Sequence, residues 1–209
     1  MKKLTILFLL ISTTCFSQKK FTTHVGLGMG GVLENKNQIP NCTSKTSIRA
    51  TGFISQYYKV NDKISIGLQA LTSGDLIGTG KCEQYNAATN TRTVSSNSMT
   101  ANSILLRGRY FLSKGTIMKP YFDMGVGTTS YTYGSITAEQ GSISKTSLAF
   151  SAEIGVEIAE KLNIAYVGIF GGKTPSFMGF DSFSNENKVL QSIRSQQMYL
   201  TVGYRLFQF

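Results

Sequence analysis

Apolar and polar residues alternate along eight segments of the chain after residue 20, with a period of two residues. This is the pattern of a β-strand with one face in an apolar environment, whereas a helix repeats its apolar positions every three or four residues. In the seventh segment, Val167 and Ile169 weaken the alternation. We therefore expect an all-β protein. The segments cover residues 21–30, 48–60, 64–70, 103–112, 122–127, 147–158, 162–170 and 197–209.

Charged residues are confined to one register of these strands. In the clearest segment, Leu148, Phe150 and Ile154 share the apolar register, and Glu153 and Glu157 lie on the opposite one. A membrane barrel needs this separation, because a charge that faces lipid at mid-depth costs roughly 2–4 kcal/mol. The polar register is rich in Gly, Ser and Thr, which suits the narrow interior of an eight-stranded barrel.

The connections between the segments alternate in length. Short ones cover residues 61–63, 113–118 and 159–161, and long ones cover 34–46, 77–101, 135–145 and 172–193. Outer-membrane barrels have short periplasmic turns and long extracellular loops. With a periplasmic N-terminus, every short connection falls on the periplasmic side. Aromatic residues that would form an interfacial girdle lie next to the short connections, namely Phe21, Tyr58, Tyr110, Phe122 and Tyr204.

The last strand, residues 197–209, alternates regularly up to Leu206 and then ends on Phe207 and Phe209, which are out of phase with Leu206. It resembles the terminal strand of bacterial outer-membrane β-barrels, which their assembly machinery recognises. Pattern and architecture together make residues 19–209 similar to the outer-membrane barrel family that includes the OmpA transmembrane domain and OmpX. The resemblance implies an eight-stranded antiparallel up-and-down transmembrane β-barrel in the cell outer membrane.

The N-terminus has the features of a secretory signal. Lys2 and Lys3 precede an apolar core at residues 4–11, and small residues at Cys15 and Ser17 favour cleavage before Gln18. The apolar run is too short for a membrane helix of about 20 residues. We assign residues 1–17 to a signal peptide and 18–209 to the barrel domain. A lipoprotein with Cys15 as its anchor is a lesser alternative, and the cleavage site resembles those of Bacteroidetes-type bacteria.

The net charge of +10 falls to +8 once Lys2 and Lys3 are removed, and charged residues make up 15% of the chain. That share is below the usual quarter, as expected when much of the surface does not face water. The basic residues are scattered, whereas nucleic-acid-binding proteins cluster them, so no nucleic-acid partner is expected. The expected partners are outer-membrane lipid, anionic lipopolysaccharide and the assembly machinery, and we expect a monomer.

Charged residues on the inward register should form an ionic network. Unpaired charges inside a narrow barrel are costly, and adjacent strands would bring Arg107 and Arg109 next to Asp123. We predict that the network fills the interior and closes it to bulk flow, and the alternative is a gate or narrow pore that the network controls. Its predicted members are Lys59, Arg107, Arg109, Asp123, Glu153, Glu157 and Arg205.

Two cysteines, Cys42 and Cys82, remain after removal of the signal. Both fall in long loops on the same side of the predicted barrel. The exported compartment is oxidising, which favours a disulfide between them, and the alternative is two unpaired thiols. No second Cys/His pair exists to complete a tetrahedral metal site, so we expect no metal and no cofactor.

Two further features have weak catalytic or binding potential. Residues 26–31 formally match a glycine-rich nucleotide motif, but such a motif needs a turn between a strand and a helix. His24, the only histidine, would lie near the periplasmic end, away from outer-leaflet chemistry, so we expect no catalytic residue.

The loop at 172–193 carries the aromatic and apolar residues Phe177, Met178, Phe180 and Phe183. These residues could form a contact surface, or they could fold onto the barrel rim or touch lipid.

These features favour a structural or surface-interaction role through the long extracellular loops, and no enzymatic activity. The first alternative is a small channel or passage for apolar molecules, as in OmpW-like barrels. A lipid A-modifying enzyme and a soluble lipocalin-like binder are less favoured.

Overall fold

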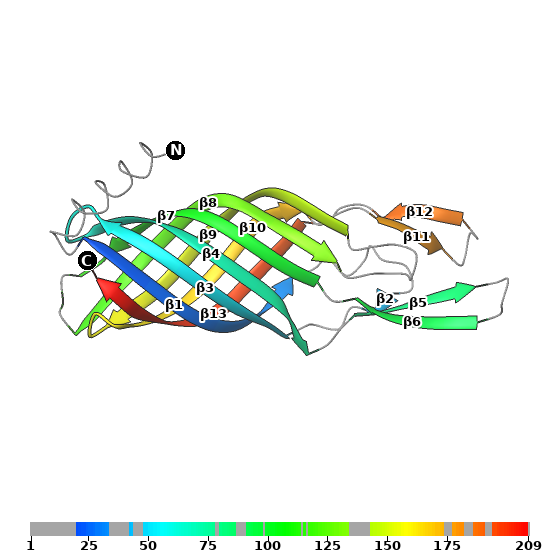
Figure 1. Cartoon of the computed structure of the whole chain (residues 1–209), viewed down its shortest axis with the longest axis horizontal. Helices are drawn as coiled ribbons and strands as arrows, with labels where there is room; N and C mark the ends of the chain where they lie inside the picture. Colours follow the sequence, from blue (N-terminus) through cyan, green and yellow to red (C-terminus); the bar gives the residue numbers. More distant parts are fainter. Residues whose placement is uncertain are drawn as a thin grey trace, which may run out of the picture.

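The computed structural model describes residues 20–33, 42–43, 48–77, 80–86, 91–97, 99–113, 115, 117–133, 143–173, 177–181, 186–190 and 194–208. Eight strands close into an antiparallel barrel in the order β1-β13-β10-β9-β8-β7-β4-β3, which confirms the predicted up-and-down topology (Figure 1). These strands are β1 (Phe21–Leu33), β3 (Ile48–Lys59), β4 (Ile64–Ile77), β7 (Met99–Phe111), β8 (Met118–Tyr133), β9 (Ile143–Ile158), β10 (Leu162–Lys173) and β13 (Arg194–Gln208). No helix in the described part of the chain has the length and apolar character needed to cross a bilayer.

One end of the barrel, here called the turn end, carries the short connections together with the start of β1 and the end of β13 (Figure 1). Backbone hydrogen bonds tie the rim together there, with Lys59 N donating to Lys20 O at 2.7 Å and Ala159 N donating to Ile117 O at 2.7 Å. The opposite end, here called the loop end, carries the long connections.

The β9–β10 turn is the tightest of these connections. Ala159 and Glu160 both have positive φ, 49° and 57°, and Lys161 N donates to Ile158 O at 3.0 Å. Positive φ at both central residues is typical of a type I′ turn, whose twist matches that of a hairpin. Positive φ costs energy for residues other than Gly. The Lys119 ammonium donates to the Glu160 carboxylate and lowers its pKa, which helps to hold the turn.

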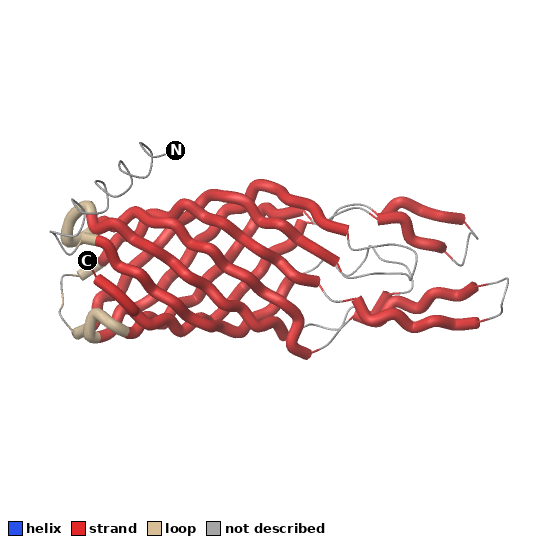
Figure 2. Tube along the Cα trace, in the orientation of Figure 1, coloured by secondary structure: helices blue, strands red, loops and turns tan. Residues whose placement is uncertain are grey.

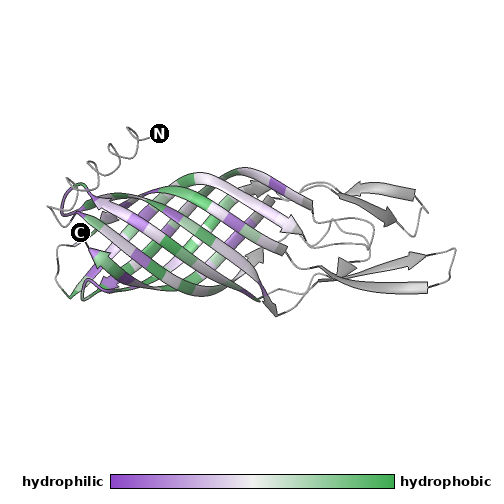
Figure 3. Cartoon of the chain, viewed as in Figure 1, coloured by the Kyte–Doolittle hydropathy of each residue, from purple (hydrophilic) through white to green (hydrophobic). Residues whose placement is uncertain are grey.

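Hydrophobic and hydrophilic residues recur along the barrel strands (Figure 3), and the apolar ones on the outward register are exposed. Leu27 is 74% exposed, Leu148 66% and Ile104 64%, although none of them lies in a flexible loop. Each exposed Leu or Ile side chain in water forgoes about 1.5–3 kcal/mol of burial free energy, so a surface of this kind needs an apolar medium. Phe21 contacts Tyr58 at a ring-centroid distance of 5.1 Å, and Tyr110 pairs directly with Phe122, at the turn end.

The interior contains an apolar cluster in addition to polar residues. Val167 and Ile169 point inward and are 1% and 0% exposed, which explains why β10 alternates poorly. Leu105 and Tyr199 belong to the same cluster. The small-residue interior expected from Gly, Ser and Thr is therefore only part of the packing.

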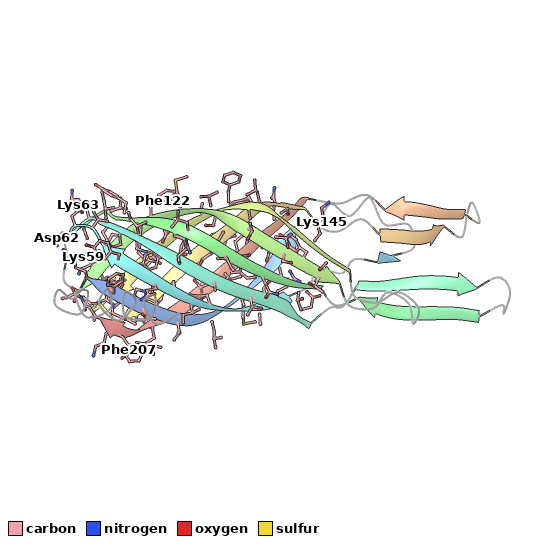
Figure 4. The ribbon with its side chains drawn as sticks, turned by 45° about the horizontal axis from the view of Figure 1, so that its top comes forward. Lys59, Asp62, Lys63, Phe122, Lys145 and Phe207 are labelled. Carbon is pink, nitrogen blue, oxygen red and sulfur yellow. The ribbon has the colours of Figure 1, made fainter. Side chains whose placement is uncertain are left out.

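A β-bulge explains the phase of Phe207, and Phe209 lies outside the described residues. Along β1 and β13, Thr23 pairs with Phe207 and the next residue, His24, pairs with Arg205, so Leu206 is the extra residue. A bulge of this kind lets two successive residues face the same side. Leu206 and Phe207 are both outward, 46% and 55% exposed, and Figure 4 shows Phe207 on the outer surface.

Strands continue beyond the loop end, within segments that the sequence predicted as loops (Figure 2). One sheet has the order β2-β5-β6, from β2 (Cys42–Thr43), β5 (Gly80–Asn86) and β6 (Thr91–Asn97). A second sheet pairs β11 (Phe177–Asp181) with β12 (Glu186–Leu190). Alternation within these segments was too weak to reveal the hairpins. The predicted signal peptide, residues 1–17, lies outside the described residues.

Close strand contacts inside the barrel require glycine at Gly127 and Gly26. A Cβ at Gly127 would lie 1.9 Å from the Ile104 carbonyl oxygen, and one at Gly26 would lie 2.4 Å from the Phe53 ring and from the Val202 carbonyl oxygen. Because backbone atoms limit both sites, a methyl group there must displace a strand.

We predict that Gly127→Ala destabilises the barrel by about 1–3 kcal/mol through overpacking. The measurement is the temperature at which the compact, unboiled gel band disappears, which should fall. Gly108→Ala is the matched control on the facing strand, since its Cβ would meet nothing within 4 Å. Equal melting of the two variants would contradict the packing described for Gly127.

Candidate functional site

Three neighbouring strands bring the charged residues of the interior into one row. Arg109 on β7 pairs in register with Asp123 on β8, which pairs in register with Glu153 on β9. Arg107 lies two residues from Arg109 and therefore faces the same side of β7. Inward alternation on adjacent strands thus places two cations beside two carboxylates.

The four side chains make a closed set of ion pairs. Arg107 Nε lies 2.8 Å from Asp123 Oδ1, and its Nη1 lies 2.7 Å from Glu153 Oε2. Arg109 Nε lies 3.2 Å from Asp123 Oδ2, and its Nη2 lies 3.3 Å from Glu153 Oε1. Each arginine therefore bridges both carboxylates, and the two positive charges balance the two negative ones.

Two tyrosines complete this cluster. The Arg109 guanidinium carbon lies 4.3 Å from the Tyr57 ring centroid and 3.9 Å from that of Tyr121, so the two rings enclose the cation. Tyr57 donates to Asp123 Oδ2 at 2.6 Å, and Tyr121 donates to Glu153 Oε1 at 2.6 Å. We call Tyr57, Arg107, Arg109, Tyr121, Asp123 and Glu153 the central network.

The four charged side chains of the central network are almost completely buried. Asp123 is 0% exposed, Arg107 1%, and Arg109 and Glu153 4% each. Buried charges are tolerated only when ion pairs and hydrogen bonds replace their hydration. Arg107 also donates to Gln69 at 2.6 Å, so amide groups on neighbouring strands extend the network. The charges of the central network are therefore both buried and neutralised.

Near the turn end, Glu157 lies 2.9 Å from Arg205 Nη2, and His24 Nε2 lies 3.5 Å from Arg205 Nε and 3.9 Å from Glu157 Oε2. Because Arg205 donates to His24 Nε2, that nitrogen acts as an acceptor. These residues line a polar cleft of about 70 Å³ that also contacts Lys59 and Ser65. His24 is therefore inward and hydrogen-bonded.

A polar group near the loop end was not predicted. Arg49, which is fully buried, lies 2.7 Å from Asp75. Gln197 donates to the Tyr131 hydroxyl at 2.8 Å and accepts hydrogen bonds from Ser73, at 3.2 Å, and from Tyr199. Arg49, Tyr131 and Tyr199 lie at inward-facing alternate positions of β3, β8 and β13, and this alternation is the signal that could have revealed them.

Of the residues expected in the ionic network, Lys59 lies apart. It pairs with Asp62 at 2.8 Å on the rim of the turn end, and the two side chains are 47% and 68% exposed (Figure 4). The last residue of β3 has reached the end of the barrel, so its side chain extends into solvent. The other predicted members divide between the central network and the Glu157–Arg205 pair.

A family model described as an outer membrane protein beta-barrel domain matches residues 6–205. The chain belongs to this family. Neisserial surface protein A has the same fold, with a TM-score of 0.55 and 14% identity over 89% of this chain and 97% of that one. OprG from Pseudomonas aeruginosa gives a TM-score of 0.51 and 11% identity over 90% and 95%.

The outer membrane protein AlkL, solved in lipid bilayers, gives a TM-score of 0.50 and 12% identity over 91% of this chain and 92% of that one. These low identities establish a shared fold alone. A search of curated proteins found no match.

The remaining candidate residues lie beyond the loop end of this outer-membrane barrel. Cys42 on β2 and Cys82 on β5 are direct partners in the antiparallel register. Phe177, Met178 and Phe180 lie on β11, and Phe183 lies outside the described residues. Among the residues that the structure describes, no three His, Cys, Asp or Glu residues gather as a metal site would require.

We predict that Asp123→Asn destabilises the folded barrel by about 3–5 kcal/mol, because it leaves Arg107 and Arg109 buried with one carboxylate. The loss of unfolding free energy is measured by urea denaturation in detergent or lipid, followed by far-UV circular dichroism. Lys59→Ala breaks the exposed Lys59–Asp62 pair and should cost about 0–1 kcal/mol. A similar midpoint for the two variants would show that the central network does not stabilise the fold.

Proposed function

We propose that the protein is a closed barrel of the bacterial outer membrane that carries a surface-contact structure on its loop end. The barrel spans the bilayer with its turn end in the periplasm and its loop end outside the cell. Its role is structural or interactive, and we assign it no reaction.

Location in the outer membrane is supported by the family and by the barrel surface. The outward register from Leu148 to Ile154 and its counterparts on other strands expose apolar side chains that hydrocarbon would cover. Phe21, Tyr58, Tyr110 and Phe122 lie at the turn end, where an aromatic girdle would meet the periplasmic interface. The chain would reach this membrane through the assembly machinery that recognises its last strand.

The central network is the main observation that supports a closed interior. It crosses the barrel from β3 to β9 and consists of paired, buried charges and two tyrosine rings. Opening a water-filled path would separate these pairs or require the rings to move. A second polar group at Arg49 and Asp75, and a third at Glu157 and Arg205, lie toward the two ends.

The contact role is supported by the strands beyond the loop end. Two small sheets, β2-β5-β6 and β11-β12, extend away from the barrel, a larger structure than connecting the barrel strands requires (Figure 1). A fold relative, Neisserial surface protein A, is named for exposure at the surface. Lipopolysaccharide is the expected neighbour, because the net charge of +8 that remains without Lys2 and Lys3 favours an anionic leaflet. A monomer is expected, since a closed barrel leaves no free strand edge.

A planar-bilayer measurement tests the closed interior against passage of solutes. We expect the purified wild-type barrel to show no steady conductance, because the central network blocks ions. The double variant Arg107→Ala/Arg109→Ala, which empties the centre, should conduct at least transiently. A steady open channel from the wild type would contradict the proposal and favour a transport role.

A surface-labelling experiment tests the orientation. A short epitope inserted between β5 and β6 should bind antibody on intact cells. The same epitope inserted at residues 61–63 should bind only after the outer membrane is permeabilised. Labelling of the 61–63 insertion on intact cells, or none of the β5–β6 insertion, would overturn the orientation.

A further inference from the structure

We propose that Cys42 and Cys82 form an intramolecular disulfide that joins β2 to β5 and fixes the β2-β5-β6 sheet on top of the β3–β4 hairpin. The proposal goes beyond the surface-contact role, because it concerns how the contact structure is held. It rests on one part of the proposed function, export into an oxidising compartment.

The strand register places the two cysteines opposite each other. Cys42 pairs with Cys82, and Thr43 pairs with Lys81, in an antiparallel ladder. Opposed residues in such a ladder have Cα atoms about 4.5–5.5 Å apart. A disulfide needs a Cα separation of about 4.4–6.8 Å, so either kind of antiparallel pair satisfies it.

The cysteine pair can be compared with the register of the β3–β4 hairpin. From Arg49–Asp75 to Lys59–Ser65, residues that face each other across β3 and β4 lie at equal distances along the chain from Asp62, and the register shifts by one residue at Ile48–Ile77. Cys42 lies twenty residues before Asp62 and Cys82 twenty residues after it. The cysteine pair therefore has the register of the main part of the β3–β4 hairpin, beyond the one-residue shift at Ile48, and the β2–β5 ladder itself aligns the two residues.

A covalent link explains how so short a strand can stay in place. β2 has two residues, and the ladder to β5 contains two residue pairs. Few hydrogen bonds oppose the loss of chain entropy when a surface segment is ordered. A disulfide between partners that the β2–β5 ladder has already aligned removes most of the remaining freedom.

The oxidation requires an electron acceptor, which is the disulfide of a thiol–disulfide exchange protein in the periplasm. The thiolate of one cysteine attacks that disulfide, forms a mixed disulfide and releases one carrier thiolate. The second cysteine thiolate then attacks the sulfur of the first and releases the other carrier thiolate. Two electrons pass to the carrier, and its two thiolates take up the two protons.

Peptide mapping of the full chain isolated from membranes without reductant tests the proposal. After alkylation of free thiols and trypsin digestion, residues 37–45 and 82–92 should appear as one linked species. Its mass should be two hydrogens below the sum of the two peptides, and reduction should separate them. Wild-type protein should contain less than a tenth of either cysteine in alkylated form.

Register variants separate this pairing from chance proximity. In Cys42→Ser/Thr43→Cys, the new cysteine lies on the opposite side of the strand, so the linked fraction should fall at least tenfold. Adding Lys81→Cys and Cys82→Ser moves both cysteines to the next pair in the ladder, and the link should return. Equal linkage in all three proteins would refute the register, even with a disulfide present.

Alkylation of both cysteines in the wild type, or a disulfide between two copies of the chain, would overturn the proposal. The epitope between β5 and β6 reports export independently of the cysteines. An exported, surface-labelled barrel with two free thiols therefore refutes the disulfide alone, whereas a chain retained in the cytoplasm refutes the proposed location.

Discussion

The structure depends on the cost of placing a charge in hydrocarbon. A barrel strand has two faces, and at mid-depth a charge on the outer face costs roughly 2–4 kcal/mol. Every strand charge that the described residues carry at mid-depth must then point inward, into a space that eight strands leave only wide enough for side chains. Apolar residues such as Leu148 and Ile104 can occupy the outer face only because the medium there is not water.

The inward charges are stable because they neutralise one another. Within the described barrel, arginines and carboxylates pair in equal numbers, as Arg107 and Arg109 do with Asp123 and Glu153. Desolvation of these groups is offset by ion pairs, tyrosine hydroxyls and ring faces acting together. In the proposed closed barrel, the arrangement that satisfies the charges also blocks the lumen, so a closed interior and a stable barrel would have one cause. The proposed contact role then falls to the strands beyond the loop end.

The sequence predicted most of the fold because alternation and loop length are local features, which can be read without knowing which strands pair. It also brought Arg109 and Asp123 together, since neighbouring strands with known inward faces leave few partners. Tyr57 was missing from the prediction because tyrosine is common in strands on either register. Its role depends on contacts with Arg109 and Asp123, which lie on strands far from it in the sequence. The bulge at Leu206 could not be predicted, because an extra residue changes the phase only once the partner strand is known. The β5–β6 hairpin was missed because its polar residues carry no apolar face.

Spin-label accessibility along β9 tests the central claim most directly. Single labels from Leu148 to Ile158 in the barrel reconstituted into lipid would be exposed in turn to oxygen, which partitions into hydrocarbon, and to a water-soluble nickel complex. The account predicts strong oxygen collision at Leu148, Phe150 and Ile154, and protection from both reagents at Ser151 and Glu153. Nickel collision at the outward positions would contradict a lipid-facing surface, and nickel collision at the inward positions would contradict a closed interior.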